Sequence, residues 1–174
     1  MSFSMSRASL PALEMGLNAL SSVLDKADAF ATAKKIDPSV LLNTRLAPDM
    51  FALTRQVQVA TDLAKNGAAR LAGVEPPRYE DNETTIPQLK ARLAKTVAYL
   101  KTLDQKQIDN AVDREIIFPL GPTHKGQMTG ADYLNHFLLP NVYFHLSVAY
   151  AILRHCGVGL DKPDFMGAIP LKMV

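Results

Sequence analysis

The chain has little cysteine, no tryptophan and no excess of charge. Its 174 residues include one cysteine, so an internal disulfide is excluded, and the chain suits a reducing compartment. Lysine and arginine together number 19, aspartate and glutamate 17, and the formal net charge is +2. Because there is no basic excess and no basic stripe interleaved with aromatic residues, we expect no nucleic-acid partner.

Targeting signals and long apolar runs are also missing from the sequence. The first residues, MSFSMSRASLPALEMG, lack the basic start and continuous apolar run of a signal peptide. No window approaches the ~20 consecutive apolar residues that a membrane-spanning helix needs. We therefore expect a cytoplasmic protein without a membrane partner. A chain of 174 residues, 48% of them hydrophobic, is long enough for a single domain over 1–174 with its own core.

The sequence does contain four long stretches with the apolar periodicity of an α-helix. Ser9 and Pro11 suit the first turn of the first stretch, and the segment KKIDPS ends it. Apolar side chains spaced by three and four residues share one face of a helix. In the first stretch they are Leu10, Leu13, Leu17, Leu20, Leu24, Ala27 and Ala31.

Proline, glycine and a capping box bound the next two stretches. The second opens at Pro48-Asp49 and ends at Gly73. The third opens at Thr85, which can form a capping box with Gln88 because each side chain can accept a hydrogen bond from the other residue's free N–H. We expect the basic side chains of the third stretch to be solvated, like those of Lys34-Lys35.

The helical period is lost over residues 110–128 and returns in a fourth stretch. The lost part, REIIFPLGPTHKGQ, predicts an extended segment or a small hairpin. The fourth helix is predicted over 129–155, with Asp132 in a second candidate capping box and Gly157 as its stop. Pro140 must kink or break it. The predicted fold is all-α, a four-helix bundle with a short irregular or hairpin insert before the last helix.

Two histidines, His145 and His155, share the fourth stretch with the single cysteine, Cys156. Ten residues along an α-helix correspond to about 280° of rotation and about 15 Å of rise, so one metal ion cannot take both from a straight helix. No HxxxH or HExxH motif is present. His155 suits the end of the helix dipole as a cation, whereas Cys156 at that end is a poor nucleophile.

His145 is expected to point into the bundle. The simplest interpretation is a buried neutral imidazole that hydrogen-bonds to a group of the second helix such as Gln56 or Asp62. The alternatives are a ligand pocket around His145, or a metal held by His145, Asp62 and His155. Four apolar residues share its face: Leu138, Val142, Ala149 and Ile152.

A second stripe on the fourth helix is polar and aromatic. Such a set can line a small-molecule pocket or a subunit interface, or it can pack against the 110–128 insert. The sequence favours none of these over the others. The stripe and its neighbour at the helix start are Asn141, Tyr143, Ser147, Tyr150 and Arg154.

A family resemblance enters at the C-terminal part of the chain. Residues 137–167, FLLPNVYFHLSVAYAILRHCGVGLDKPDFMG, resemble the signature of a domain-of-unknown-function family in the DinB/YfiT-like superfamily. The runs LPALEMGLNALSSVLDKA and MFALTRQVQVATDLAK resemble that family too, so the resemblance covers nearly the whole chain. It implies a four-helix bundle of up-down-down-up type and frequently a homodimer.

The resemblance also implies a metal, because the superfamily is described as metalloenzymes, some of them thiol S-transferases. In that pattern one histidine from helix two and two from later helices hold a divalent metal. This chain departs from it: helix two has no histidine, and the later histidines are not four apart. Only His145 could occupy a ligand-like place, so we do not transfer the metal site.

Two hypotheses follow from the sequence. The first is a bundle without defined catalytic chemistry and without a cofactor, which dimerises and holds a small ligand near His145. The second is a zinc- or nickel-dependent enzyme of the superfamily type, with His145, Asp62 or Gln56, and His155 as ligands across helices. The sequence leaves open whether the protein is an enzyme.

Overall fold

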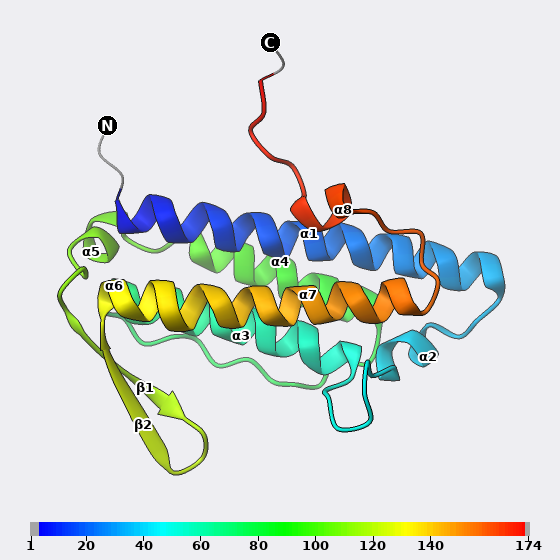
Figure 1. Ribbon diagram of the computed structural model, residues 1–174, viewed down its shortest axis with the longest axis horizontal. Helices are drawn as coiled ribbons and strands as arrows, with labels where there is room; N and C mark the ends of the chain where they lie inside the picture. The colour runs from blue at the N-terminus through cyan, green and yellow to red at the C-terminus, as the bar shows by residue number, and fades with distance from the viewer. Residues whose placement is uncertain (1–3, 173–174) are drawn as a thin grey trace.

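The computed structural model describes residues 4–172, which are mostly helical with one small two-stranded sheet (Figure 1). The long helices are α1 (Met5–Lys34), α3 (Leu53–Ala72), α4 (Ile86–Leu100) and α7 (Leu139–His155). The shorter elements are α2 (Pro38–Asn43), α5 (Gln105–Asp109), β1 (Glu115–Leu120), β2 (His124–Thr129), α6 (Gly130–Asp132), the π-helical segment η1 (Tyr133–Leu138) and α8 (Lys162–Met166).

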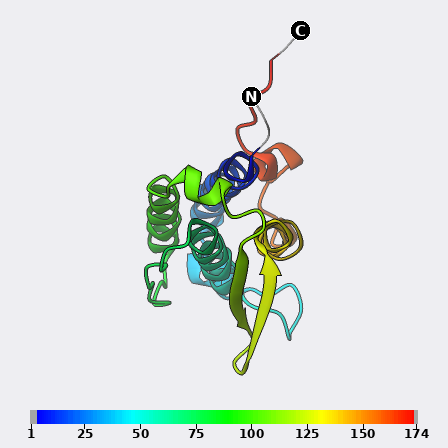
Figure 2. The same ribbon diagram turned by 90° about the vertical axis from the view of Figure 1, so that its left-hand side faces the viewer.

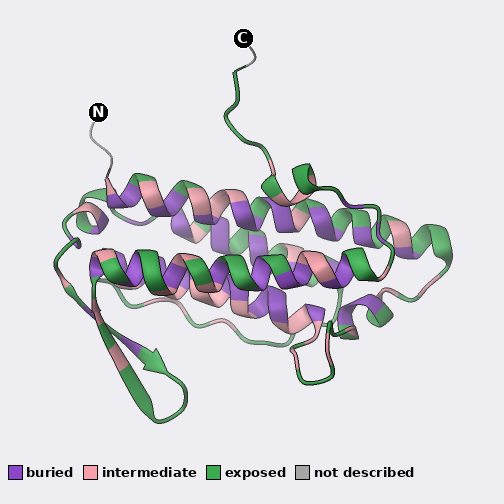
Figure 3. Cartoon of the chain, in the orientation of Figure 1, coloured by how far each residue is buried: buried purple, intermediate pink, exposed green. Residues whose placement is uncertain are grey.

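The long helices lie side by side around one apolar core. α7 packs on α1 and α3, and α4 packs on the same two helices from the other side (Figure 2). α1 and α7 run in one direction, and α3 and α4 in the opposite one (Figure 1). The pairs Gln56 with His145 and Gly67 with Leu138 show the antiparallel register of α3 and α7. The buried residues lie on the sides of these helices that face one another (Figure 3).

The predicted helices are present, but two of their starts were wrong. α1 begins at Met5, one turn earlier than Ser9 and Pro11 indicated, and Pro11 lies inside it on an exposed position. α3 begins at Leu53, because Pro48-Asp49 belong to a preceding turn. The Thr85 capping box is confirmed.

Three short helices escaped sequence analysis because each is too short to show a helical period. α2 and α5 begin at aspartates whose side chains accept a backbone N–H, those of Asp37 and Asp104. α8 begins at Asp161, which forms a capping box with Asp164. A capping residue alone predicts where a helix can start, but not that one does.

The segment before the last helix is an antiparallel hairpin, which is one of the two forms predicted for it, an extended segment or a hairpin. β1 and β2 pair from Glu115 opposite Thr129 to Leu120 opposite His124. The hairpin projects from the helices (Figure 2). Its one large aromatic, Phe118, anchors it: the Phe118 ring lies 4.9 Å from that of Tyr133 and 4.3 Å from that of Phe137.

Pro140 neither breaks nor ends the last helix. The turns before it are π-helical, and the N–H of Leu139 donates to the carbonyl of Leu134, five residues back. A π-helical segment can accommodate a proline, which has no N–H to donate, and here the π-helical turns come just before Pro140. α6, η1 and α7 thus form one continuous rod, which stops at Gly157 with φ of 90°.

This rod, Gly130–His155, is the one described helix long and apolar enough to cross a membrane by length and composition. The sequence analysis did not anticipate it, because its apolar residues are interrupted. In the structure it packs between α1 and α3 and supplies core residues such as Leu138 and Ile152. That environment is the one expected of a core helix.

A substitution of Gly130 tests how closely the start of the rod packs against Ala111. A Cβ at Gly130 would lie 2.8 Å from the carbonyl carbon of Ala111 and closer still to its oxygen. Because this neighbour is backbone, we expect Gly130→Ala to lower the free energy of unfolding by about 1–3 kcal/mol, measured by urea denaturation. The control is Gly159→Ala, where no atom lies within 4 Å. Equal midpoints for the two variants would contradict the close contact.

Candidate functional site

His145 lies in the interior, paired with the second helix of the sequence analysis, which is α3. Its Nδ1 is 2.7 Å from Oε1 of Gln56, and the Nε2 of Gln56 donates to the carbonyl of Phe51 at 3.1 Å. Because the Gln56 amide nitrogen is a donor, its Oε1 is the acceptor, and Nδ1 of His145 carries the proton. The interpretation of a buried imidazole bonded to Gln56 is confirmed.

The surroundings of His145 favour its neutral form. The side chain is 9% exposed, and burial lowers the pKa of His145 below the ordinary value of 6.5. The positive charge of Arg55 lowers this pKa further. The neutral ring has Nε2 as an acceptor, and the ring of Phe144 meets the imidazole edge-on with centroids 5.2 Å apart.

Asp62, the other predicted partner, does not meet His145. Its carboxylate lies 2.8 Å from the guanidinium of Arg92 and 3.5 Å from the ammonium of Lys65. The predicted metal set of His145, Asp62 and His155 is therefore not brought together. Among the described residues, no three His, Cys, Asp or Glu side chains are grouped to hold a metal ion. The residues present do not fit the metal that the resemblance implies.

Arg92 corrects the expectation that the basic side chains of α4 are solvated. Its side chain is 2% exposed and lies among three carboxylates, those of Asp62, Asp81 and Glu83. Its Nε donates to the hydroxyl of Thr61 at 2.7 Å. A guanidinium has five N–H donors in a fixed plane, so one buried arginine can bind several acceptors at once. The sequence pattern missed this because the carboxylates come from α3 and a loop.

The loop that Arg92 holds also presents an aromatic ring to three cations. Tyr79 lies with its ring 4.5 Å from Nζ of Lys65, 4.2 Å from Nζ of Lys95 and 5.3 Å from Cζ of Arg92. The Lys65 ammonium also donates to the carbonyl of Pro77 at 2.6 Å. Burial lowers the pKa of Lys65, and Asp62 opposes that shift. Loop 73–85 is thereby fastened across α3 and α4.

The tyrosines of the second stripe face α1. Tyr143 and Tyr150 line a cavity between α1 and α7, together with Leu146. They do not pack against the hairpin, which uses Phe118 for that purpose, so that alternative was wrong. Ser147 is exposed and takes no part in the cavity.

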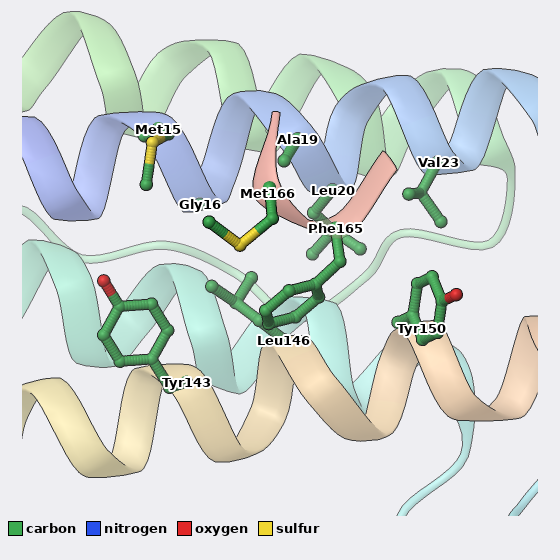
Figure 4. Close-up of a pocket in the computed structure, with 10 residues that line it drawn as sticks. All are labelled: Met15, Gly16, Ala19, Leu20, Val23, Tyr143, Leu146, Tyr150, Phe165 and Met166. Carbon is green, nitrogen blue, oxygen red and sulfur yellow. The ribbon is translucent and has the colours of Figure 1, made fainter. Parts of the chain in front are cut away.

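The cavity has a volume of about 240 Å³ and an almost wholly apolar lining. Figure 4 shows the rings of Tyr143 and Tyr150 toward its two ends, with Leu146 and Phe165 between them. α1 supplies the opposite wall: Met15, Gly16, Ala19, Leu20 and Val23. A Cβ at Gly16 would lie 2.6 Å from Cδ1 of Leu146, so α1 and α7 approach each other closely beside the cavity.

α8 covers the cavity from outside. Phe165 and Met166 line it, and the ring of Phe165 meets that of Tyr150 edge-on, with centroids 5.8 Å apart. An ion pair of 2.7 Å between Lys26 and Asp164 fastens α8 to α1. Sequence analysis found Tyr143 and Tyr150 but missed this cover, because five residues show no helical period.

The remaining candidates lie apart from both sites. Asn141 donates from its amide to the carbonyl of Phe137 at 2.7 Å, a bond within its own helix. Arg154 and His155 are exposed in the last turn of α7, and Cys156 follows as its C-cap. The predicted site residues thus lie in several places, namely the His145–Gln56 pair, the cavity, the Arg92 cluster and the surface of α7, rather than in one pocket.

Replacing Arg92 tests the charge cluster. We expect Arg92→Met to lower the free energy of unfolding by about 3 kcal/mol, because three carboxylates, two of them half-buried, lose their shared partner. The matched control is Lys90→Met on the same helix, which removes an ion pair with an exposed Asp25 and should cost less than about 1 kcal/mol. Chemical denaturation measures both. Similar losses of unfolding free energy in the two variants would show that Arg92 contributes no more than an ion pair at the surface.

The His145 environment predicts a pH dependence. Because the folded pKa lies below 6.5, the unfolded chain takes up this proton first as pH falls. The contribution of His145 to the free energy of unfolding is complete above about pH 7. It declines as the pH falls through 6.5, until the pKa of His145 in the folded protein is reached. We expect His145→Gln to remove this part of the decline between pH 7 and 5. Parallel stability curves of the two proteins would contradict it.

Comparison with known proteins fits this architecture. The family model described as a domain of unknown function, DUF1993, matches residues 5–166. The crystal structure of a DinB family member protein from Shewanella denitrificans, at 1.83 Å resolution, is similar with a TM-score of 0.90 and 40% sequence identity. The match covers 97% of this chain and 95% of that one. The curated proteins give no match. The chain therefore belongs to the DUF1993 family, a domain-of-unknown-function family within the DinB-like superfamily.

Proposed function

We propose that this protein is a binding protein for a small apolar molecule, built on an up-down-down-up four-helix bundle. The helix directions support the bundle type, since α1 and α7 run against α3 and α4 (Figure 1). The long segment 73–85 between α3 and α4 also supports it, because two consecutive parallel helices need a connection along their full length.

The observation that carries the binding function is the cavity between α1 and α7. Close-packed protein interiors leave few spaces larger than a water molecule. A space of about 240 Å³ lined by apolar side chains is therefore unusual inside a helix pair. Apolar cavities of about 150 Å³ stay dry and take up benzene, so this one is large enough for a single aromatic ring with a short substituent.

The lining also defines the ligand's chemistry. Within residues 4–172, no lysine, arginine, aspartate, glutamate or histidine lines the cavity, so a charged ligand would lose its hydration without gaining a partner. The hydroxyl of Tyr150 donates to the carbonyl of Leu160 at 3.4 Å. Tyr143 has its hydroxyl at the rim, where it can hydrogen-bond to one polar atom of a ligand (Figure 4).

This proposal moves the ligand away from His145, where the sequence placed it. His145 and Leu146 are consecutive on α7 and therefore about 100° apart around the helix. The first faces Gln56 on α3 and the second faces Gly16 on α1. Among the described residues that line the cavity there is no nucleophile paired with a base and no histidine, cysteine or carboxylate, so the proposed role is binding and not catalysis.

A titration with toluene tests the proposal. We expect saturable binding of one toluene per chain, measured by calorimetry or by shifts of NMR signals from α1 and α7. Val23→Phe places a ring inside the cavity and should weaken binding at least tenfold. The matched control, Val40→Phe, changes a 57% exposed residue of α2 and should leave binding unchanged. No saturable binding, or equal binding by both variants, would overturn the proposal.

A further inference from the structure

α8 forms the outer wall of the cavity, and it is held less firmly than the walls that α1 and α7 supply. All five of its residues are exposed or half-buried, including Phe165 and Met166, which line the cavity. On the other walls, Leu20 and Leu146 are each 4% exposed. A segment with few buried apolar contacts opens at a lower free-energy cost than a packed helix does. α8 is therefore the wall that moves most easily.

The chain just before α8 is anchored to α7. Val158 is 1% exposed and Leu160 is 2% exposed. The N–H of Val158 donates to the carbonyl of Leu153 at 3.1 Å. The carbonyl of Leu160 accepts from the hydroxyl of Tyr150. The chain after α8 is different, because residues 168–172 are exposed and run outward from the helices (Figures 1 and 2). The fixed point of α8 is thus Leu160, on its N-terminal side.

Local hydrogen bonds hold α8 together, so it can move as one piece. In its capping box the N–H of Asp161 donates to the carboxylate of Asp164 at 2.9 Å. At its other end the N–H of Gly167 donates to the carbonyl of Pro163 at 2.9 Å. Both bonds lie within residues 161–167, so neither has to break when this segment leaves α1.

An ion pair close to the surface helps to hold α8 against α1. The ammonium of Lys26 lies 2.7 Å from the carboxylate of Asp164, and the two side chains are 49% and 21% exposed. We call this pair the latch. The other contacts are apolar, such as that of Gly167, where a Cβ would lie 3.1 Å from the Cβ of Ala19. An exposed ion pair is weak and is screened by salt, so the latch can break without disturbing the bundle.

The position of α8 also decides how a ligand enters the cavity. Phe165 and Met166 lie across the space between α1 and α7 (Figure 4). Separating α1 from α7 would expose the core that these helices share. Lifting α8 exposes mainly half-buried side chains and the cavity itself. A ring-sized molecule therefore enters at the lowest cost past α8.

We propose that α8 is a lid, which opens about Leu160 to admit the ligand and is held closed by the Lys26–Asp164 latch. This inference rests on the binding function proposed above and says how that site is gated. A bound ligand contacts Phe165 and Met166, so it stabilises the closed position of α8. Loss of the latch raises the open population, and the ligand then enters and leaves faster.

Thiol labelling of the ligand-free protein tests the opening. Val23 lines the cavity and is 2% exposed, so methyl methanethiosulfonate reaches the thiol of Val23→Cys only when α8 opens. Cys156→Ser removes the native thiol from every variant. We expect Lys26→Met to raise the labelling rate about two- to fivefold, the range of an exposed ion pair. The matched control is Lys34→Met, which removes an exposed charge from the same helix and should leave the rate unchanged.

Two further measurements separate a lid from general loosening of the fold. Sodium chloride at about 1 M should speed labelling of Val23→Cys while Lys26 is present, but not in Lys26→Met, which has already lost the latch. Val57→Cys, at a core position that is 0% exposed, should label slowly and at the same rate with or without Lys26→Met. Immediate labelling of Val23→Cys, or a rate that Lys26→Met does not change, overturns the lid.

Toluene exchange, measured by NMR, tests whether the lid controls the ligand. We expect Lys26→Met to raise the association and dissociation rates by the same factor and to leave the dissociation constant unchanged. A change in the cavity itself would alter the dissociation constant instead. Equal toluene rates in Lys26→Met and Lys34→Met would contradict the lid.

The lid and the proposed binding function can fail separately. Toluene binding at rates that do not depend on the latch would leave the binding function standing and remove the lid. Labelling of Val23→Cys that depends on the latch, without toluene binding, would remove the binding function and keep the opening of α8.

Discussion

The close approach of the last helical rod to α1 and α3 is the constraint on which the rest of the structure depends. Two glycines permit it: a Cβ at Gly16 would lie 2.6 Å from Cδ1 of Leu146, and a Cβ at Gly67 would lie 2.7 Å from Cδ2 of Leu138. This seating brings His145 to Gln56 on one face of α7. It also leaves, on the neighbouring face, the cavity that α8 covers.

The polar interactions have a different role from the apolar ones. The apolar contacts hold the helices together, whereas the charge cluster around Arg92 fastens the loop that connects α3 to α4. That loop must run along two parallel helices, so it has no tight turn to define it. Instead, the buried guanidinium of Arg92 binds three carboxylates, and Tyr79 packs against the neighbouring cations. These contacts hold the loop in one conformation, as a short turn would otherwise do.

The sequence predicted the long helices correctly, because their apolar spacing repeats over many residues. It failed for short elements and for contacts between residues that are far apart in the chain. The apolar spacing of Leu13, Leu17 and Leu24 predicted a core face, and all three are at most 1% exposed. The five residues of α8 are too few for a period, yet they cover the cavity. For His145 the sequence offered Gln56 and Asp62 alike, because both lie on α3. Only the helix rotation and the competing Arg92 separate them.

By itself the sequence determined the four long helices, the capping box at Thr85, an extended or hairpin segment before the last helix, the inward-facing His145 and the family. These follow from residues near one another in the chain, through spacing and local hydrogen bonding. Only the tertiary structure decided which side chains share a site. It placed Asp62 with Arg92, turned Tyr143 and Tyr150 toward α1, and left a cavity beneath α8. Such contacts depend on how helices rotate and approach one another, and that is set by packing across the whole core.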